Sequence, residues 1–349
     1  MDVIARLGLS IPLVQAPMAG TSTAALAATV CACGGLGSIA IGALDAAAAG
    51  RAIADVRART DRPFNVNVFA HAPPRRDAGV EAGWLAALAP VFARHDAVPP
   101  AELRPIYPSF DEDAAMLAAL LAAPPAVVSI HFGLPAPWAL SALRDAGCLL
   151  LASVTSPEEA AAAERAGIDV LVAQGWEAGG HRGCFDPDAP DDRLGTMALS
   201  RLLVARGRLP VIAAGGIMDG HGIRAAMALG AVAAQLGTAF VACPESAASD
   251  AHRAALTRDG GRHTVMTRAI SGRPARCVAN AFTAWDAEAT ARAPAYPLAY
   301  DAGKALHAAA SARGDHGYGA HWAGQGAPLA RALPAADLMA LLAREYAAG

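Results

Sequence analysis

The sequence predicts a (β/α)8 barrel, in which eight parallel strands alternate with helices that surround them. First, short apolar segments alternate with alanine-rich segments of helical pattern between residues 13 and 238, as in consecutive parallel βα units. Second, eight apolar segments fit into this stretch. Third, the last three of them end in glycine, which suits strand ends that bring backbone amides close to a ligand. The 349 residues are enough for one such barrel with added segments.

The βα units carry recognisable strand and helix signals. Leu13 to Met18 is the first predicted strand, and the Thr-Ser-Thr of residues 21–23 is expected to cap a helix that ends at Gly34-Gly35. A second helix is expected from Asp45 to Arg59, and Ser156-Pro157 marks the start of a later one. The other strands are expected at 36–42, 64–69, 126–133, 148–154, 168–174, 209–217 and 231–238.

Two regions interrupt or extend the barrel, which we assign to residues 1–238. Residues 72–110 hold several prolines and follow the third strand, so we expect a lid or active-site loop there, since extended βα loops cover the carboxyl face of such barrels. A helix is expected at about 111–122. Residues 239–310 are expected to form an added substrate or lid element. Residues 311–349 are expected to close back on the barrel through a helix at 335–347.

Composition excludes several classes of function. The net charge is −3 and the longest basic cluster is Arg75-Arg76, so we expect no binding to nucleic acid or anionic lipid. The uncharged stretches 7–44 and 225–244 are interrupted by Gly, Pro and Gln, which argues against a membrane span. No signal-peptide pattern is evident, so we expect a cytoplasmic protein. The six scattered cysteines predict reduced core residues and no metal site.

The glycine-ended strands suggest a phosphate site. In barrels of this class, the loops after strands seven and eight form the usual phosphate site, together with a helix N-terminus. Gly215-Gly216 and Gly237-Thr238 stand in those two places. Any one glycine could simply end a strand, but three in successive units favour a bound phosphate.

Eight motifs together resemble one family. They are QAPMAG (15–20), FNVN (64–67), SIHFG (129–133), QGWEAGGHRG (174–183), AAGGI (213–217), QLGT (235–238), SGRPAR (271–276) and WAGQG (322–326). They resemble the motifs of the nitronate monooxygenases, formerly called 2-nitropropane dioxygenases, which are FMN-dependent TIM-barrel enzymes. The resemblance runs over nearly the whole chain.

The resemblance implies FMN as the cofactor and assigns residues to it. Asn67 and Gln174 would hydrogen-bond the polar edge of the flavin, as uncharged amides can. Without the resemblance, Asn67 is equally a polar residue of the barrel interior, and Met18 is more often plain core. The other implied cofactor contacts are Ala16, Pro17, Met18, Gly179, Gly180, Gly215, Gly216, Gln235, Leu236, Gly237, Thr238 and, near the cofactor, Gln325.

His131 is the candidate catalytic residue. It ends the fourth strand between Ile130 and Phe132, where an apolar setting keeps imidazole neutral and able to accept a proton. The residues alone favour a buried histidine that bonds a backbone carbonyl. The resemblance to the family's HFG motif implies a base or a substrate-orienting group above the flavin.

Other polar residues are substrate-side candidates. His181 lies in an EAGGH segment that also resembles the flavin-dependent enoyl-acyl-carrier-protein reductases, and it could instead brace the glycine turn with Glu177 by hydrogen bonds. Tyr296, Tyr300 and Lys304 could reach the site from the added element, or simply begin a surface helix.

The function implied by the resemblance is oxidation of alkyl nitronates by O2 to a carbonyl compound and nitrite. One alternative keeps the flavin and makes the chain an NAD(P)H-dependent reductase of quinones or enoyl thioesters, since proteins of one fold differ in substrate. A second alternative is a barrel lyase, isomerase or binder that takes a phosphorylated ligand and no flavin. The partners expected are a small-molecule substrate and O2, and the sequence leaves a homodimer open.

Overall fold

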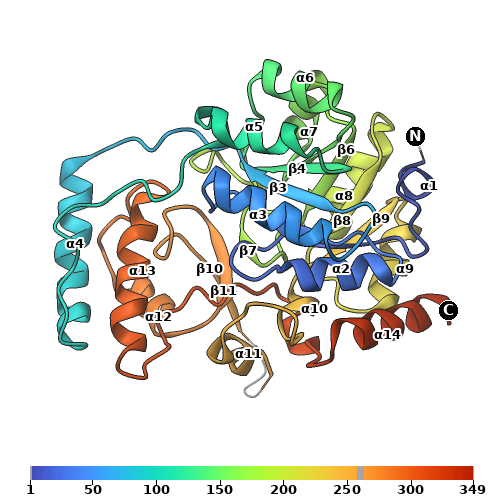
Figure 1. Cartoon of the computed structure of the whole chain (residues 1–349). Coiled ribbons are helices and arrows are strands. Elements are labelled where there is room, and N and C mark those ends of the chain that lie inside the picture. The colour runs from blue at the N-terminus through green and yellow to red at the C-terminus, as the bar shows by residue number, and fades with distance from the viewer. Residues whose placement is uncertain (1, 258–262, 349) are drawn as a thin grey trace.

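The computed structural model describes residues 2–257 and 263–348, and an eight-stranded parallel barrel forms its centre (Figure 1). The barrel strands are β1 (Leu13–Gln15), β2 (Ser38–Ala40), β3 (Asn65–Phe69), β4 (Val127–His131), β5 (Leu149–Val154), β6 (Val170–Gln174), β8 (Val211–Ala214) and β9 (Ala233–Leu236). They pair in the order β1-β9-β8-β6-β5-β4-β3-β2. A parallel bridge between Val14 and Leu36 brings the two ends of this sheet together. The predicted barrel is confirmed.

Helices follow the barrel strands and pack around the outside (Figure 1). The predicted caps are confirmed at Thr23 and Ser156, whose side chains accept hydrogen bonds from the backbone N–H groups of the first helical turns. Asp45 caps α3 in the same way. The helices are α2 (Ala24–Ala32), α3 (Ala46–Arg57), α5 (Ala114–Ala122), α6 (Pro137–Asp145), α7 (Pro157–Ala166), α8 (Thr196–Arg206) and α9 (Gly220–Ala228). None of the helices in the described ranges is long and apolar enough to cross a membrane.

The two ends of the barrel differ in chemistry. At the amino end, α1 (Val3–Leu7) packs its apolar side chains into one cluster with inward residues such as Val127, Leu149 and Ile212. At the carboxyl end, the buried side chains of the strands include Asn67, Ser129 and Gln174, all polar. A ligand site therefore lies at the carboxyl end, as is usual for this fold.

The insertion after β3 contains a helix that the sequence did not reveal. Helix α4 (Ala78–Ala93) lies within the predicted loop and packs against α13 (Leu298–Ser311), far along the chain. Buried Trp84 meets Trp285 edge to face, with ring centroids 5.2 Å apart. A short 3-10 turn, η1 (Phe110–Glu112), then precedes α5. Only Tyr107 of residues 72–110 lines the cavity described below, so most of the insertion supports the added region.

The added region sits beside the carboxyl face of the barrel (Figure 1). It comprises α10 (Thr238–Val241), α11 (Asp250–Thr257), β10 (Thr264–Thr267), β11 (Ala275–Val278), α12 (Ala281–Glu288), α13 and η2 (Ala327–Leu329). A two-residue strand within the glycine turn after β6, β7 (Gly180–His181), pairs antiparallel with β11. This pairing attaches the added region to the barrel next to the site.

The chain ends as the sequence predicts. Helix α14 (Ala335–Ala347) packs against α9 and α2 on the outside of the barrel. All six cysteines lie in the described ranges, and all but Cys33 are buried, so five of the six are core residues as predicted.

Candidate active site

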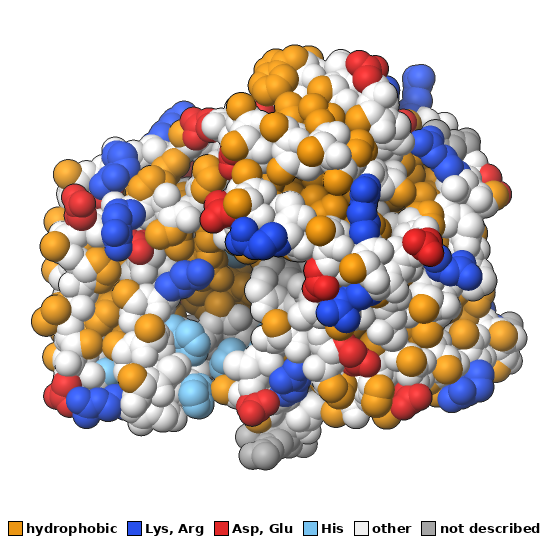
Figure 2. Space-filling view, viewed as in Figure 1, with side chains coloured by type: hydrophobic (Ala, Val, Ile, Leu, Met, Phe, Trp, Pro, Cys, Tyr) orange, Lys and Arg blue, Asp and Glu red, His pale blue; other side chains and the backbone are white. Residues whose placement is uncertain are grey.

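A cavity of about 430 Å³ lies between the carboxyl ends of the barrel strands and the added region. Every barrel strand, or the loop after it, contributes to the lining, and residues 252, 296, 300, 304, 322, 324 and 326 contribute from the C-terminal part. In the space-filling view the surface is hollowed between the region of α13 and the barrel, with histidines gathered beside the hollow (Figure 2). The volume is that of a cofactor or small-molecule site.

Bare backbone amides meet at one end of the cavity, after β8 and β9. Gly215 and Gly216 adopt φ values of 123° and 70°, which favour glycine. Within the described ranges, the N–H groups of Gly215, Gly216 and Gly237 donate no hydrogen bond to the protein. Unpaired amides of this kind suit an anion such as a phosphate. The structure thus places the predicted phosphate residues together at the expected loops.

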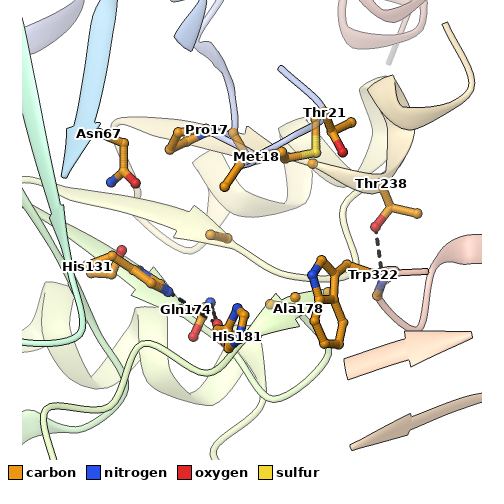
Figure 3. Close-up of a pocket in the computed structure, with 18 of the residues that line it drawn as sticks. Pro17, Met18, Thr21, Asn67, His131, Gln174, Ala178, His181, Thr238 and Trp322 are labelled. Atoms are coloured by element: carbon orange, nitrogen blue, oxygen red, sulfur yellow. Dashed lines mark hydrogen bonds between the residues drawn. The ribbon is translucent and has the colours of Figure 1, made fainter. Parts of the chain in front are cut away.

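Gly179 has a different reason to be glycine. A Cβ there would lie 2.5 Å from the backbone C of Ala323 and the N of Gly324, so Gly179 permits the 322–326 segment to pack onto the turn. The N–H of Gly324 also donates to the hydroxyl of Thr238 at 2.9 Å (Figure 3). This segment, which lines the cavity with Trp322, Gly324 and Gly326, is therefore held by two loops of the barrel.

Glu177 braces the glycine turn by hydrogen bonds, which is the structural role that the sequence allowed for it. Its carboxylate accepts hydrogen bonds from the backbone N–H of Thr196 at 2.8 and 3.0 Å and from the Thr196 hydroxyl at 2.9 Å. It thereby ties the turn to the start of α8. The ring of His181 forms no hydrogen bond within the described ranges and so takes no part in this bracing, whereas its backbone carbonyl accepts hydrogen bonds from the side chains of His131 and Gln174.

The polar side chains on β3 and β6 are used differently. The amide nitrogen of Asn67 donates to the backbone oxygen and the hydroxyl of Ser129, both at 3.0 Å, and its oxygen has no partner in the described ranges. The amide of Gln174 is occupied at both atoms. Its nitrogen donates to the carbonyl of His181 at 3.0 Å, and its oxygen accepts from the N–H of Gly183 at 2.7 Å. The side-chain oxygen of Asn67 is therefore free to accept a hydrogen bond from a ligand, whereas the Gln174 amide bonds the backbone of His181 and Gly183.

Of the histidines that line the cavity, His131 and His181 lie at the ends of β4 and β7, and both are neutral at physiological pH. Burial lowers the pKa of His131 to about 4, although the carbonyl of His181 partly opposes this shift. Burial, and next the proximity of His131, lowers the pKa of His181 to about 3. The Nε2 of His181 is buried without a hydrogen-bond partner in the described ranges, so Nδ1 is the ring nitrogen left for a bound molecule.

Aromatic rings close the cavity opposite the barrel. Tyr296, Tyr300 and Trp322 lie with their ring centroids 5.1 to 5.9 Å from that of His181. Burial raises the pKa of Tyr300 to about 12 and also raises that of Tyr296, so both phenols remain protonated hydrogen-bond donors. The Nζ of Lys304 lies 5.5 Å from the centroid of the Tyr300 ring. This wall combines an apolar surface with donors and one exposed cation, which suits a small anion.

Phe132, next to His131, has a backbone conformation that is rare for a bulky residue. Its φ is 79°, in the left-handed region that ordinary side chains avoid. The ring packs 4.5 Å from the His131 centroid and lies under the guanidinium of Arg273, also at 4.5 Å. Such strain is characteristic of functional sites, where the surroundings hold the backbone.

A family model described as nitronate monooxygenase matches residues 3–345. The chain belongs to the nitronate monooxygenase family. A protein named nitronate monooxygenase from Paraburkholderia phytofirmans is 61 % identical over 340 residues, which cover 97 % of this chain and 93 % of that one. A second of the same name, from Pseudomonas aeruginosa, is 54 % identical over 342 residues, 97 % of each chain.

Solved structures agree with this membership of the nitronate monooxygenase family. A nitroalkane oxidase from Streptomyces ansochromogenes superposes with a TM-score of 0.89 and 42 % identity, over 97 % of this chain and 96 % of that one. FabK from Thermotoga maritima superposes with a TM-score of 0.73 and 28 % identity, over 99 % and 95 %. The nitroalkane oxidase is thus the more similar of the two.

In this nitronate monooxygenase family member, most predicted site residues line one cavity, and two do not. Leu236 is fully buried in the core, and the Gln325 side chain is exposed, with its backbone N–H donating to Glu177. The predicted residues that do line the cavity are Ala16, Pro17, Met18, Asn67, His131, Gln174, Gly179, Gly180, His181, Gly215, Gly216, Gln235, Gly237, Thr238, Tyr296, Tyr300 and Lys304.

Sequence reasoning missed several lining residues. Phe132 and Trp322 stand inside the SIHFG and WAGQG motifs, so the motifs themselves were the signal. Ser129 begins the first of these motifs. Tyr107 and His252 have no comparable local signal, because only the packing of the insertion and of α11 brings them to the cavity.

A buried ion pair supports the glycine turn from behind. The side chain of Arg182 is 1 % exposed, bonds both carboxylate oxygens of Asp191 at 2.8 and 2.9 Å, and donates to the backbone oxygen of Gln174. Burial raises the pKa of Asp191, but the hydrogen bonds from Arg182 and the Arg193 backbone, together with the two arginine charges, outweigh it, and the pKa is lowered. The pair therefore holds the turn as a charged unit.

Asp191→Asn should lower the free energy of unfolding by about 3 kcal/mol, because it leaves the Arg182 charge buried without its partner. Urea unfolding measures the loss. The control is Asp188→Asn, which breaks the solvent-exposed Arg268–Asp188 pair and should cost less than about 1 kcal/mol. Equal losses in the two variants would refute the role of the buried pair.

Proposed function

We propose that this chain binds FMN and uses O2 to oxidise alkyl nitronates, and the nitroalkanes they come from, to a carbonyl compound and nitrite. The observation that carries the proposal is the combination in one cavity of unpaired backbone amides at one end and neutral histidines with aromatic donors at the other. Family membership and the similarity to a nitroalkane oxidase support the same activity.

The cavity fits FMN in size and in the chemistry of its lining. The amides of Gly215, Gly216 and Gly237 would hold the phosphate, and the free oxygen of Asn67 would accept from the polar edge of the flavin. Pro17 and Met18 lie together over the cavity, opposite His131 and Gln174 (Figure 3), and Ala16 lines the same cavity. These three residues would pack against the flavin ring. When bound, FMN supplies the redox chemistry.

The residues of the chain would bind and orient the substrate. Lys304 at the cavity edge and the phenols of Tyr296 and Tyr300 favour an anionic nitronate by charge and hydrogen bonding. For a neutral nitroalkane, His131 takes the proton from the α-carbon, which leaves the nitronate anion and an imidazolium. His181 faces the same space and orients the nitro group.

Purified protein tests the proposal directly. It should be yellow, heat should release FMN, and adding a preformed nitronate in air should consume O2 and produce nitrite. Colourless protein that cannot be reconstituted with FMN would rule out a flavin enzyme and leave a binder or lyase of a phosphorylated ligand.

The EAGGH segment, which also resembles the flavin-dependent enoyl-acyl-carrier-protein reductases, favours a second candidate, an NAD(P)H-dependent reductase of quinones or enoyl thioesters that uses the same cavity. Anaerobic mixing with NADH or NADPH separates the two. We expect slow or no bleaching of the flavin. Rapid bleaching, together with weak activity on nitronates, would favour the reductase.

A further inference from the structure

The imidazole of His131 is held on three sides. Its Nε2 lies 3.2 Å from the carbonyl oxygen of His181, and the Phe132 ring packs against one flank. On the third side, a Cβ at Gly183 would lie 2.8 Å from the Cε1 of His131, so the absence of a side chain at residue 183 makes room for the ring. A ring held in this way has one preferred orientation.

That orientation decides which ring nitrogen carries the hydrogen. A backbone carbonyl can only accept a hydrogen bond, so the Nε2 of His131 must be the donor in its contact with His181. In a neutral imidazole the other nitrogen, Nδ1, then holds the lone pair. Nδ1 forms no hydrogen bond in the described ranges and is not among the fully buried nitrogens.

Gln174 holds the His181 carbonyl, the group that fixes the tautomer of His131. Its amide nitrogen and the Nε2 of His131 both point at the His181 oxygen, as the dashed lines of Figure 3 show. Its amide oxygen accepts from the N–H of Gly183. On the other side of the turn, β7 pairs with β11, with His181 opposite Ala275. The carbonyl is therefore fixed between the barrel and the added region.

We propose that the His181 carbonyl, positioned by Gln174 and by the space left at Gly183, locks His131 as the tautomer protonated at Nε2 and presents Nδ1 to the substrate as the proton acceptor. Gln174 and Gly183 are then positioning residues. The kinetic part of this inference rests on the proposed function, while the tautomer does not.

The proton balance of the step is simple. The α-carbon–hydrogen bond of the nitroalkane breaks, its electron pair stays on the substrate as the nitronate, and the proton goes to Nδ1. The ring then carries hydrogen on both nitrogens and one positive charge. The His181 carbonyl, already bonded to the Nε2 hydrogen, stabilises that charge, because hydrogen bonds from ionised donors are stronger than neutral ones.

Long-range proton–nitrogen correlation spectra of protein labelled with ¹⁵N-histidine test the tautomer without any turnover. The His131 signals are assigned by their loss in His131→Gln. We expect a single neutral tautomer with hydrogen on Nε2 near neutral pH in the flavin-bound protein. Hydrogen on Nδ1, or rapid averaging between the two forms, overturns the proposal.

Gly183→Ala tests the positioning. We expect the His131 signals to shift towards a mixture of tautomers and kcat/KM for a neutral nitroalkane to fall at least about 10-fold, with kcat/KM for its preformed nitronate changed less than about 3-fold. The matched control is Gly83→Ala, where a Cβ meets nothing within 4 Å. Gln174→Leu should act in the same direction as Gly183→Ala.

The outcomes are distinct. Unchanged His131 signals and unchanged kinetics in Gly183→Ala refute the positioning, as do equal losses on both substrates. If the wild-type protein has no nitronate activity, the proposed function fails, and the spectra of the wild-type protein still decide the tautomer.

Discussion

Replacing His131 with asparagine should lower kcat/KM for a neutral nitroalkane by at least about 100-fold, the usual contribution of a general base. Preformed nitronates need no proton removal, so their oxidation should change far less. Asparagine keeps a side-chain donor near the His181 carbonyl but offers no basic nitrogen. The measurement compares kcat/KM for one nitroalkane and for its own nitronate.

His181→Asn is the matched variant, since both histidines line the cavity and both have a lowered pKa. We expect this variant to slow the oxidation of both substrates to a similar extent, because His181 orients the substrate and does not remove its proton. If His181→Asn selectively lowered kcat/KM for the nitroalkane and His131→Asn did not, His181 and not His131 would be the base.

Acid should destabilise the protein below about pH 6.5, because His252 and His321, two stacked histidines, are kept neutral by burial. His252 and His321 are 6 % and 7 % exposed, with ring centroids 5.2 Å apart. Burial, the largest cause, lowers the pKa of each to about 4 from an ordinary value of 6.5. The Nε2 of His252 donates to the backbone oxygen of Trp322 at 3.1 Å, and this hydrogen bond also supports the cavity wall.

The direction follows from proton binding. Between about pH 6.5 and pH 4 the unfolded chain binds protons that these folded histidines do not, so stability is greatest above pH 6.5 and falls as the pH drops. The shift corresponds to about 3 kcal/mol for each group. His131 and His181 act in the same direction, as do His71 and His307, whose pKa burial also lowers.

Urea unfolding at about pH 7 and about pH 5 measures this loss. His321→Asn should make stability less dependent on pH, while His221→Asn, at an exposed position on α9, should leave the dependence as it is. Stability that stays constant between these pH values would contradict the assignment of buried neutral histidines.

Local patterns predicted the barrel well. Eight apolar segments became eight strands, the caps at Thr23 and Ser156 formed as expected, and the last helix spans Ala335 to Ala347. Helix α4 was missed because prolines flank it and Pro90 lies inside it, which locally favours a loop. Its partner α13 lies about two hundred residues away, and no local pattern records that contact.

The site shows the same division. Glycines at strand ends and a histidine between apolar residues are visible in the sequence, and both lie at the cavity. The sequence did not show that the Gln174 amide is occupied by the protein, or that Gly179 is needed for packing against residue 324. Those roles depend on which atoms meet after the chain has folded.

The sequence by itself determined the barrel and the residues its strand ends bring together, because the alternation of apolar and helical segments is local and repeated. Only the tertiary structure decided what each of them does there. The added region returns from beyond residue 239 to pair β11 with β7, and this contact places the His181 carbonyl against His131. A hydrogen bond between groups fifty residues apart, set by a strand pairing a hundred residues further on, has no sequence pattern of its own.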